Sequence, residues 1–186
     1  MFGRRTGQAA AKHSSEIGAQ IRSQIVIQAA NDELDSFLKT GDELARPLQR
    51  ALRINLWENC GVVRDESRLL KGLEKLQEIK AASSSVDVRP DAEGYQDLAI
   101  ALDLRASIIS AETTLRSALA RQESRGAHQR KDYPDISQEF NVNIRIGIDN
   151  NNKQVLTKQP VLQVPSSLQS WLEEQSDLPV AGRLLE

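Results

Sequence analysis

Apolar residues recur with a helical period through the first two thirds of the chain. The first stretch, from Gly3 to about Lys39, has isoleucines four residues apart, at Ile17, Ile21 and Ile25, which predicts a helix. An unbroken helix of that length would span roughly 50 Å. We therefore expect two pieces, with a bend near Gly18 or Asn31-Asp32.

Three further helices are predicted between Asp42 and Ser124. The first begins near Asp42 or Pro47 and stops at Cys60-Gly61. The second has Asp65 as its N-cap, and the third runs from about Ala92 to Ser124, after a loop at 81–93. The residues expected to face a core are Leu48, Leu52, Leu56 and Trp57 on the first helix, Leu69, Leu70, Leu73, Leu76 and Ile79 on the second, and Ala101, Leu104, Ile108, Ala111, Leu115 and Ala118 on the third.

From Phe140 onward the period changes to two. Val142, Ile144, Ile146 and Ile148 alternate with less apolar residues, which predicts a half-buried strand. The polar run 149–153 is a turn, and 155–164 returns as an edge strand that carries Pro160. Such a hairpin needs support from the helices. Ser166-Ser167 then caps a short helix with Leu168, Trp171 and Leu172 on its apolar side.

Composition agrees with a helical protein. The chain has 186 residues, of which 27% are charged and only 4% aromatic, and its net charge is -2. We expect a mainly α fold, a three- to four-helix up-down bundle (spectrin-repeat-like) over residues 14–134, with a β-hairpin and tail over 135–186. The near-neutral charge argues against a nucleic-acid partner, which requires a basic face.

The single cysteine, Cys60, excludes an internal disulfide, and with only His13 and His128 beside it no zinc cluster is expected. Cys60 is interpreted as a small apolar residue at a helix end rather than as a reactive thiol. The chain has no run of 18 apolar residues and no signal-peptide pattern. These features predict a soluble, intracellular protein without direct membrane insertion.

The stretch 120–134 is the most distinctive part of the chain. Gly126 can take a positive φ at the end of the preceding helix, and Arg121 and Arg125 would place positive charge at the negative end of its dipole. Pro134 then forces an extended backbone on the residue before it. So dense a polar loop is either a docking surface or a solvated connection.

This loop resembles the signature loop in the C-terminal helical domain of the succinate dehydrogenase and fumarate reductase flavoproteins, a family that includes L-aspartate oxidase. The matching residues are Arg121-x-Glu123-Ser124-Arg125-Gly126-Ala127-His128-x-Arg130-x-Asp132-Tyr133-Pro134. Further resemblances, in the same order, are Phe2-Gly-Arg-Arg-Thr-Gly7, Leu56-Trp57 with Gly61-Val-Val-Arg64, and Asp103-Leu-Arg105 with Ala111-Glu112 and Arg116.

The resemblance implies that residues 1–13 are a remnant of the helix that closes an FAD domain. No G-x-G-x-x-G turn is present in the chain, and the family's substrate-binding and catalytic residues lie upstream of the matched segments. We therefore expect no catalytic, cofactor-binding or metal-binding residue here, and an inactive chain when isolated. The expected cofactor of the parent protein is FAD, and its expected partners are the flavin domain of the same polypeptide and an iron-sulfur subunit.

The same resemblance assigns roles to individual side chains. Those expected to dock the helical domain onto the flavin domain are Arg121, Glu123, Arg125, His128, Arg130, Asp132 and Tyr133. A structural network is expected among Trp57, Arg64, Arg105, Glu112 and Arg116. Glu112 would pair with Arg116 along the helix surface or with Arg105 inside the bundle. His128 is interpreted as a structural hydrogen-bonding residue rather than a general base.

Three functions follow from these patterns. The first is the C-terminal domain of a flavoenzyme that interconverts succinate and fumarate by hydride transfer to or from FAD, located in the cytoplasm or on the cytoplasmic face of a membrane through partner subunits. The second is the corresponding domain of L-aspartate oxidase. The third is a free-standing helical interaction module, which would have no need of the segment at residues 2–10.

Overall fold

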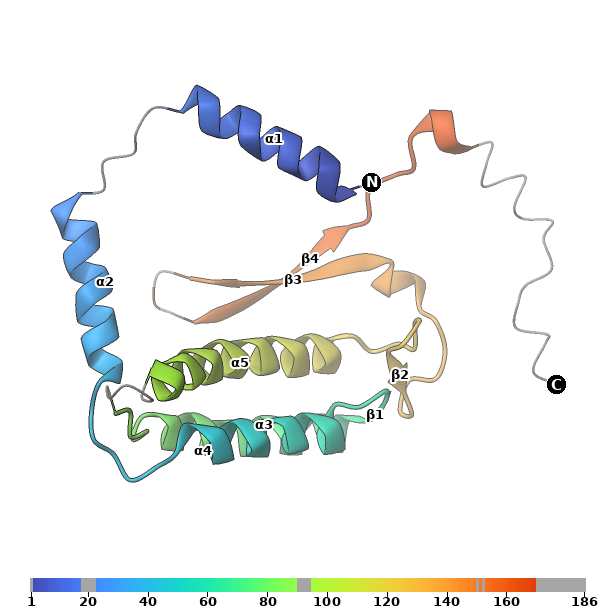
Figure 1. Cartoon of the computed structure of the whole chain (residues 1–186). Helices are drawn as coiled ribbons and strands as arrows, with labels where there is room; N and C mark the ends of the chain where they lie inside the picture. The colour runs from blue at the N-terminus through green and yellow to red at the C-terminus, as the bar shows by residue number, and fades with distance from the viewer. Residues whose placement is uncertain (1, 18–22, 90–94, 150, 152, 170–186) are drawn as a thin grey trace. The chain divides into compact units, whose positions relative to one another are not determined.

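The structure is a computed structural model that describes residues 2–17, 23–89, 95–149, 151 and 153–169. The predicted apolar positions Ile21, Trp171 and Leu172 and the first of the two alternative bend positions, Gly18, lie outside these residues. The second alternative, Asn31-Asp32, is wrong, because it lies within the unbroken helix Gln24–Phe37. The elements are, in chain order, α1 (Phe2–Glu16), α2 (Gln24–Phe37), α3 (Ala45–Asn59), β1 (Val63–Arg64), α4 (Glu66–Ser83), α5 (Tyr95–Ala120), β2 (Gln129–Arg130), η1 (Gln138–Phe140), β3 (Val142–Ile148) and β4 (Gln154–Pro160). The predicted mainly α class with a C-terminal hairpin is confirmed (Figure 1).

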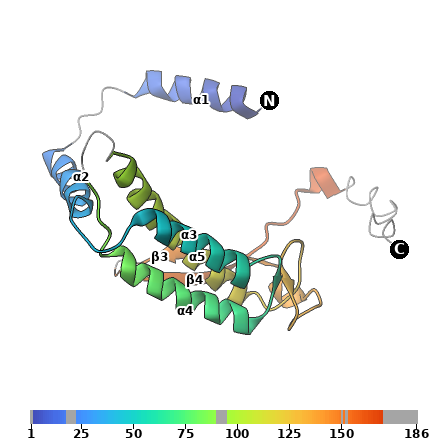
Figure 2. The same cartoon turned by 60° about the horizontal axis from the view of Figure 1, so that its bottom comes forward.

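The chain divides into two compact units, and each contains part of the three long helices. The first unit is 1–51 with 79–107, and the second is 52–78 with 108–186. Within each unit the segments of α3, α4 and α5 lie side by side, as Figure 1 and Figure 2 both show. The second unit also holds both short strand pairs and all residues of the polar loop.

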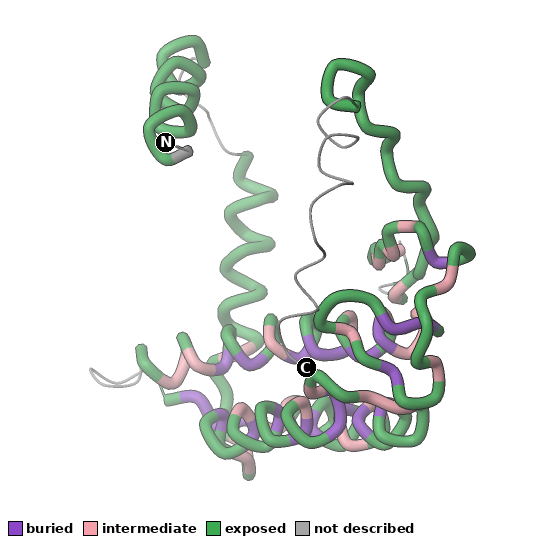
Figure 3. The backbone as a smooth tube through the Cα atoms, turned by 90° about the vertical axis from the view of Figure 1, so that its right-hand side faces the viewer, coloured by how far each residue is buried: buried purple, intermediate pink, exposed green. Residues whose placement is uncertain are grey.

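In the first unit, the buried apolar residues come from α3, the end of α4, the segment that follows it, and α5. They are Ala45, Leu48, Ile79, Val86, Val88, Ala101 and Leu104. The helices α1 and α2 contribute no buried side chain among their described residues, as the exposed tube in Figure 3 shows. The C-terminal end of α2 nevertheless contacts α5, because Arg105 on α5 forms an ion pair with Glu33 and stacks on the ring of Phe37.

The second unit has an apolar core of its own. Its buried residues are Leu52, Cys60, Leu69, Leu76, Ile108, Ala111, Leu115, Ala118 and Phe140. Gly72 on α4 allows close approach here, since a Cβ at that position would lie 2.8 Å from Cδ2 of Leu115. The predicted α5 stripe from Ala101 to Ala118 is confirmed throughout.

Two predicted core positions are wrong. Trp57 is 83% exposed and Leu70 is 50% exposed. The buried face of α3 instead includes Asn55 and Asn59, where Asn55 donates to the carbonyl of Gly72 at 2.9 Å and Asn59 donates to Asn55 at 2.8 Å. These amides rotate the buried face of the helix away from Trp57.

The N-cap predicted at Asp65 is confirmed. Its Oδ1 accepts from the backbone N–H of Arg68 at 2.9 Å and from the hydroxyl of Ser67 at 2.6 Å. These bonds, that from Ser67 first, hold the pKa of Asp65 below its ordinary value.

Replacing this cap should weaken α4 at its first turn. We expect Asp65→Ala to lower the free energy of unfolding by about 1 kcal/mol, because a backbone N–H loses its acceptor. Urea unfolding followed by circular dichroism measures this. Glu74→Ala, an exposed change on the same helix, serves as the matched control, and an equal loss in both variants would contradict the capping role.

The hairpin β3–β4 is antiparallel, with Val142 opposite Pro160 and Ile148 opposite Gln154. Val142, Ile144 and Ile146 are half-buried and alternate with exposed residues, as the period-two pattern predicts. The return strand ends at Pro160, earlier than the predicted 164. The expected support is present, because Gln154 on β4 donates to the hydroxyl of Thr113 on α5 at 3.4 Å.

Candidate functional site

The polar loop begins earlier than its sequence suggests. Helix α5 ends at Ala120, whereas the predicted end was Ser124. Gly126 does adopt a positive φ, of 58°, but in the turn where Arg125 and His128 exchange backbone hydrogen bonds. Immediately after this turn, β2 pairs in parallel with β1, with Val63 opposite Gln129 and Arg64 opposite Arg130.

Glu123 is the centre of one half of the site. Its side chain is fully buried and accepts hydrogen bonds from Arg121, from Nε and Nη2 of Arg125, and from the backbone N–H of Ser137. The bonds from Arg125, then from Ser137 and Arg121, outweigh the effect of burial and lower the pKa of Glu123 to about 2. A carboxylate held in this way stays charged at neutral pH.

Arg121 connects this cluster to the hairpin. Its Nη1 donates to the carbonyl of Phe140 at 2.9 Å, and its Nη2 donates to the carbonyl of Val142 at 2.7 Å. One guanidinium thus fixes the end of α5 relative to the first residue of β3. Arg121 and Arg125 were predicted to interact with the dipole of α5; in the structure Arg121 binds Glu123 and the carbonyls of Phe140 and Val142, and Arg125 binds Glu123.

Arg130 supplies the positive charge at the helix end instead. Its side chain is 1% exposed, and its Nη1 donates to the carbonyls of Ala118, Leu119 and Arg121 at 2.9, 3.2 and 3.2 Å. Ala118 and Leu119 lie in the last turn of α5, whose carbonyls have no helical partner, and Arg121 directly follows the helix. A guanidinium at this position also complements the negative end of the helix dipole.

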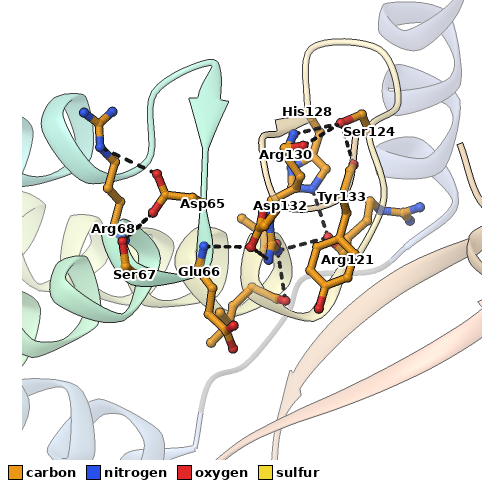
Figure 4. A network of polar contacts seen from close by, with 12 residues as sticks. Asp65, Glu66, Ser67, Arg68, Arg121, Ser124, His128, Arg130, Asp132 and Tyr133 are labelled. Carbon is orange, nitrogen blue, oxygen red and sulfur yellow. Dashed lines mark hydrogen bonds and ion pairs between the residues drawn. The ribbon is translucent and has the colours of Figure 1, made fainter. Parts of the chain in front are cut away.

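Asp132 completes the second half of the site. It accepts a bidentate pair from Nε and Nη2 of Arg130, both at 2.7 Å, and the backbone N–H of Glu66 at 3.0 Å (Figure 4). The bonds from Arg130, then from Glu66, lower the pKa of Asp132 to about 2. Asp132 therefore joins the loop to the first turn of α4, and the ring of Tyr133 lies 4.9 Å from the guanidinium carbon of Arg130.

Ser124 holds the backbone of the loop in place. Its hydroxyl accepts from the N–H of Arg130 at 2.8 Å and donates to the carbonyl of Tyr133 at 2.9 Å. Its own N–H donates to the carbonyl of Asp135 at 3.1 Å. This buried serine organises the turn, a role that the sequence pattern did not indicate.

His128 lies between two arginines of the site. Nη1 of Arg64 lies 2.7 Å from Nδ1 of His128, and Nε2 of His128 lies 3.1 Å from the carbonyl of Arg121. Because a guanidinium can only donate, Nδ1 accepts and Nε2 carries the proton. Burial, together with the charges of Arg64, Arg130 and Arg121, lowers the pKa of His128. The ring is thus a neutral hydrogen-bonding link.

This arrangement makes stability depend on pH. Because the pKa of His128 is lowered in the folded chain, the unfolded chain, in which the pKa of this residue is about 6.5, binds more protons at a pH just below 6.5. The stabilisation that neutral His128 gives the fold is therefore complete above pH 6.5 and is lost as the pH falls. We expect wild-type protein to be less stable to urea at pH 5.5 than at pH 7.5.

The matched variant is His128→Gln, whose amide can accept from Arg64 and donate to the carbonyl of Arg121 without titrating. The difference in stability between the two pH values should be smaller in this variant. An unchanged difference would show that other groups cause it.

The structure brings together all seven residues predicted for docking, and it places Arg64 beside them. The other members of the predicted network lie elsewhere. Arg105 pairs with Glu33 rather than Glu112, and Glu112 accepts from Arg116 at 2.8 Å along α5, as the four-residue spacing predicted. Trp57 lies on the exposed surface of α3.

The chemistry of the site is that of a scaffold. Arg121, Arg125 and Arg130 are bound to carboxylates of the chain, so these donors do not fit the pyrophosphate of a flavin. Burial raises the pKa of the Cys60 thiol, which disfavours a reactive thiolate. Among the described residues, no group of three His, Cys, Asp or Glu side chains could hold a metal ion.

Comparison with known proteins identifies the domain. Residues 49–169 match the family described as "Fumarate reductase flavoprotein C-term". The chain belongs to this family. It corresponds to the C-terminal domain of the succinate dehydrogenase and fumarate reductase flavoproteins, which are FAD-dependent oxidoreductases.

Individual relatives agree with this assignment. The fumarate reductase flavoprotein of a Serratia species is 32% identical over 136 residues, which cover 71% of this chain and 23% of that protein. L-aspartate oxidase of Pyrococcus horikoshii is 34% identical over 125 residues, covering 67% of this chain and 21% of that protein. A structure of Escherichia coli quinol fumarate reductase matches with a TM-score of 0.75 and 25% identity, covering 88% of this chain and 30% of that one.

The chain therefore spans between a fifth and a quarter of the length of these two curated relatives. Within the described residues, none of the helices combines the length and the apolar character that a membrane span requires.

Proposed function

We propose that this domain supports catalysis by an FAD-dependent oxidoreductase that interconverts succinate and fumarate. In this proposal the chemistry belongs to a flavin domain of the same polypeptide, which exchanges a hydride with the dicarboxylate. The helical domain docks against that flavin domain through its polar loop. Its own residues hold geometry and move no proton.

The observation that carries this proposal is the folded loop itself within a chain of this family. Every residue predicted from the family resemblance to dock, from Arg121 to Tyr133, lies in one internally bonded cluster at the end of α5. Paired arginines and carboxylates of this kind give a rigid surface of defined shape. A rigid surface is what holding a neighbouring catalytic domain requires.

The proposal extends to partners and location. The match to the E. coli quinol fumarate reductase supports assembly into a larger complex, in which the electron-transport partner is an iron-sulfur subunit. We propose a cytoplasmic location, or attachment to the cytoplasmic face of a membrane through such partners.

A second candidate is the same domain in an L-aspartate oxidase. The match to the P. horikoshii enzyme, which is 34% identical over 125 residues, supports this candidate. In that case the flavin domain would oxidise an amino acid, and the role of the helical domain would be unchanged.

The test is to express the complete reading frame that contains this chain and to purify the product. We expect a yellow protein with a flavin absorption spectrum that reduces an artificial acceptor with succinate and oxidises reduced viologen with fumarate. Oxidation of L-aspartate by oxygen, without activity on succinate, would instead establish the second candidate. A colourless product without a flavin domain would contradict both and leave a free-standing helical module.

A further inference from the structure

The arginines of the loop site differ in what neutralises them. Arg121 and Arg125 share Glu123, and Arg130 is bound by Asp132. Arg64, by contrast, bonds only to neutral groups among the described residues, a carbonyl and an imidazole. Its positive charge lies in the same cluster without a carboxylate.

The position of this guanidinium is fixed by two hydrogen bonds. Nε donates to the carbonyl of Gly61 at 2.6 Å, and Nη1 donates to Nδ1 of His128 at 2.7 Å. Arg64 is half-buried on β1, and its backbone carbonyl also accepts from Lys131 at 2.9 Å. A guanidinium has five N–H groups, and among the described residues hydrogen bonds from two of them, on Nε and Nη1, hold Arg64 in a preset orientation.

Within the polar loop itself basic residues outnumber acidic ones, while the acidic residues Asp65 and Glu66, at the start of α4, lie beside Asp132. Residues 120–134 contain four basic residues and two acidic ones, Glu123 and Asp132, and both acids are bound to arginines. Lys131 is exposed, and Arg64 adds a further charge beside them. The complement of the Arg64 guanidinium is a carboxylate, which it can bind in bidentate fashion.

Exposed apolar residues occupy the same short stretch of chain. Trp57 is 83% exposed, Val62 is 62% exposed and Val63 is 46% exposed. Tryptophan and arginine are among the residue types that dominate binding energy at protein interfaces. Charge and apolar surface together indicate contact with a protein rather than with a small anion.

We propose that Arg64 is the receptor for an aspartate or glutamate side chain on the flavin domain of the same polypeptide, with Trp57, Val62 and Val63 as the apolar part of the contact. This inference rests on the proposed function. Glu123 and Asp132 bind arginines of this chain, whereas Arg64 would bind a carboxylate of the flavin domain. His128 acts as a positioning residue that aims the guanidinium.

The flavin domain is the occupant that the alignment favours. The match covers 88% of this chain but only 30% of the E. coli chain, so most of that polypeptide lies outside the matched part. A surface on the matched domain with an unneutralised guanidinium and an exposed tryptophan is suited to the rest of such a polypeptide.

The test compares the product of the complete reading frame with the 186-residue chain alone, both without substitution. Each is treated with p-hydroxyphenylglyoxal, which modifies accessible guanidinium groups, and the modified arginines are quantified by mass spectrometry. We expect Arg64 to react more slowly in the complete product by about tenfold, the change that 1.4 kcal/mol of interaction produces. Arg68, which is exposed and pairs with Asp65, should react equally in both.

A second measurement identifies the partner group. In the complete product carrying Arg64→Lys, a carbodiimide joins the introduced amine to a carboxylate in contact with it. We expect a cross-link to an aspartate or glutamate of the flavin domain, whereas Arg68→Lys should cross-link only within this chain.

The outcomes are distinguishable. Equal reactivity of Arg64 in a yellow, active product would overturn this inference and leave the proposed function standing. A cross-link only to residues of this chain or of a second copy would do the same. A reading frame without a flavin domain would overturn the inference and the proposed function together.

Discussion

Replacing Glu123 by glutamine should lower the free energy of unfolding by about 3 kcal/mol, because it leaves the guanidinium of Arg121 without its buried counter-charge. Glu123 is fully buried and bonded to two arginines and a backbone N–H. Glutamine keeps the shape but not the charge, and its amide N–H groups would face donors. Urea unfolding at pH 7 measures the loss.

The control is Glu139→Gln, which removes an exposed carboxylate paired with Lys158 at 3.5 Å. Exposed pairs contribute up to about 1 kcal/mol, and often nothing measurable. The pH dependence gives a second check. With the pKa of Glu123 at about 2 in the folded chain, its contribution is present above the unfolded pKa of about 4.3 and is lost as the pH falls toward 2. This acid sensitivity should be reduced in Glu123→Gln, and an unchanged profile would contradict the assignment.

Replacing Arg130 by methionine should be at least as damaging, with an expected loss of about 3–5 kcal/mol. The change removes the donor to three carbonyls at the end of α5 and the bidentate partner of Asp132. Methionine is unbranched and fills much of the same space, so the loss reflects polar bonds more than volume. Thermal and urea unfolding both measure it.

Arg130→Lys separates charge from geometry. It keeps the positive charge but cannot make the forked contact with Asp132 while reaching the helix carbonyls, so we expect an intermediate loss. Lys131→Met, at the exposed neighbouring position, is the control and should change stability by less than about 0.5 kcal/mol. Equal stability of wild type and Arg130→Met would refute the capping role.

Helical periodicity identified most of the fold because it reports which residues face a core. The stripe on α5 was recovered residue by residue, and Asp65 was recognised as an N-cap from its place before an apolar run. Trp57 was misplaced because periodicity counts apolar residues only. The side that α3 buries is decided by Asn55 and Asn59, and a polar residue carries no such signal in a sequence.

The site could be located from sequence but not assembled from it. The residues of the loop were found through family resemblance, yet the pairing of each charge was not. Glu123 binds Arg125 two positions away and also Arg121, whose other bonds reach Phe140 and Val142. Such pairings depend on where α5 ends. Because the helix ends at Ala120 and not at the predicted Ser124, residues 121–124 are free of helical geometry and their side chains reach other partners.

The parallel pairing of β1 with β2 and the adjacent hydrogen bond from Glu66 to Asp132 join parts of the chain that are far apart in sequence. The Glu66–Asp132 bond spans 66 residues, so its formation requires closure of a loop that contains α4 and α5. Contacts of such long range form slowly compared with helices. We therefore expect the helices to form first and the polar cluster to close late, so that substitutions such as Arg130→Met accelerate unfolding far more than they slow refolding.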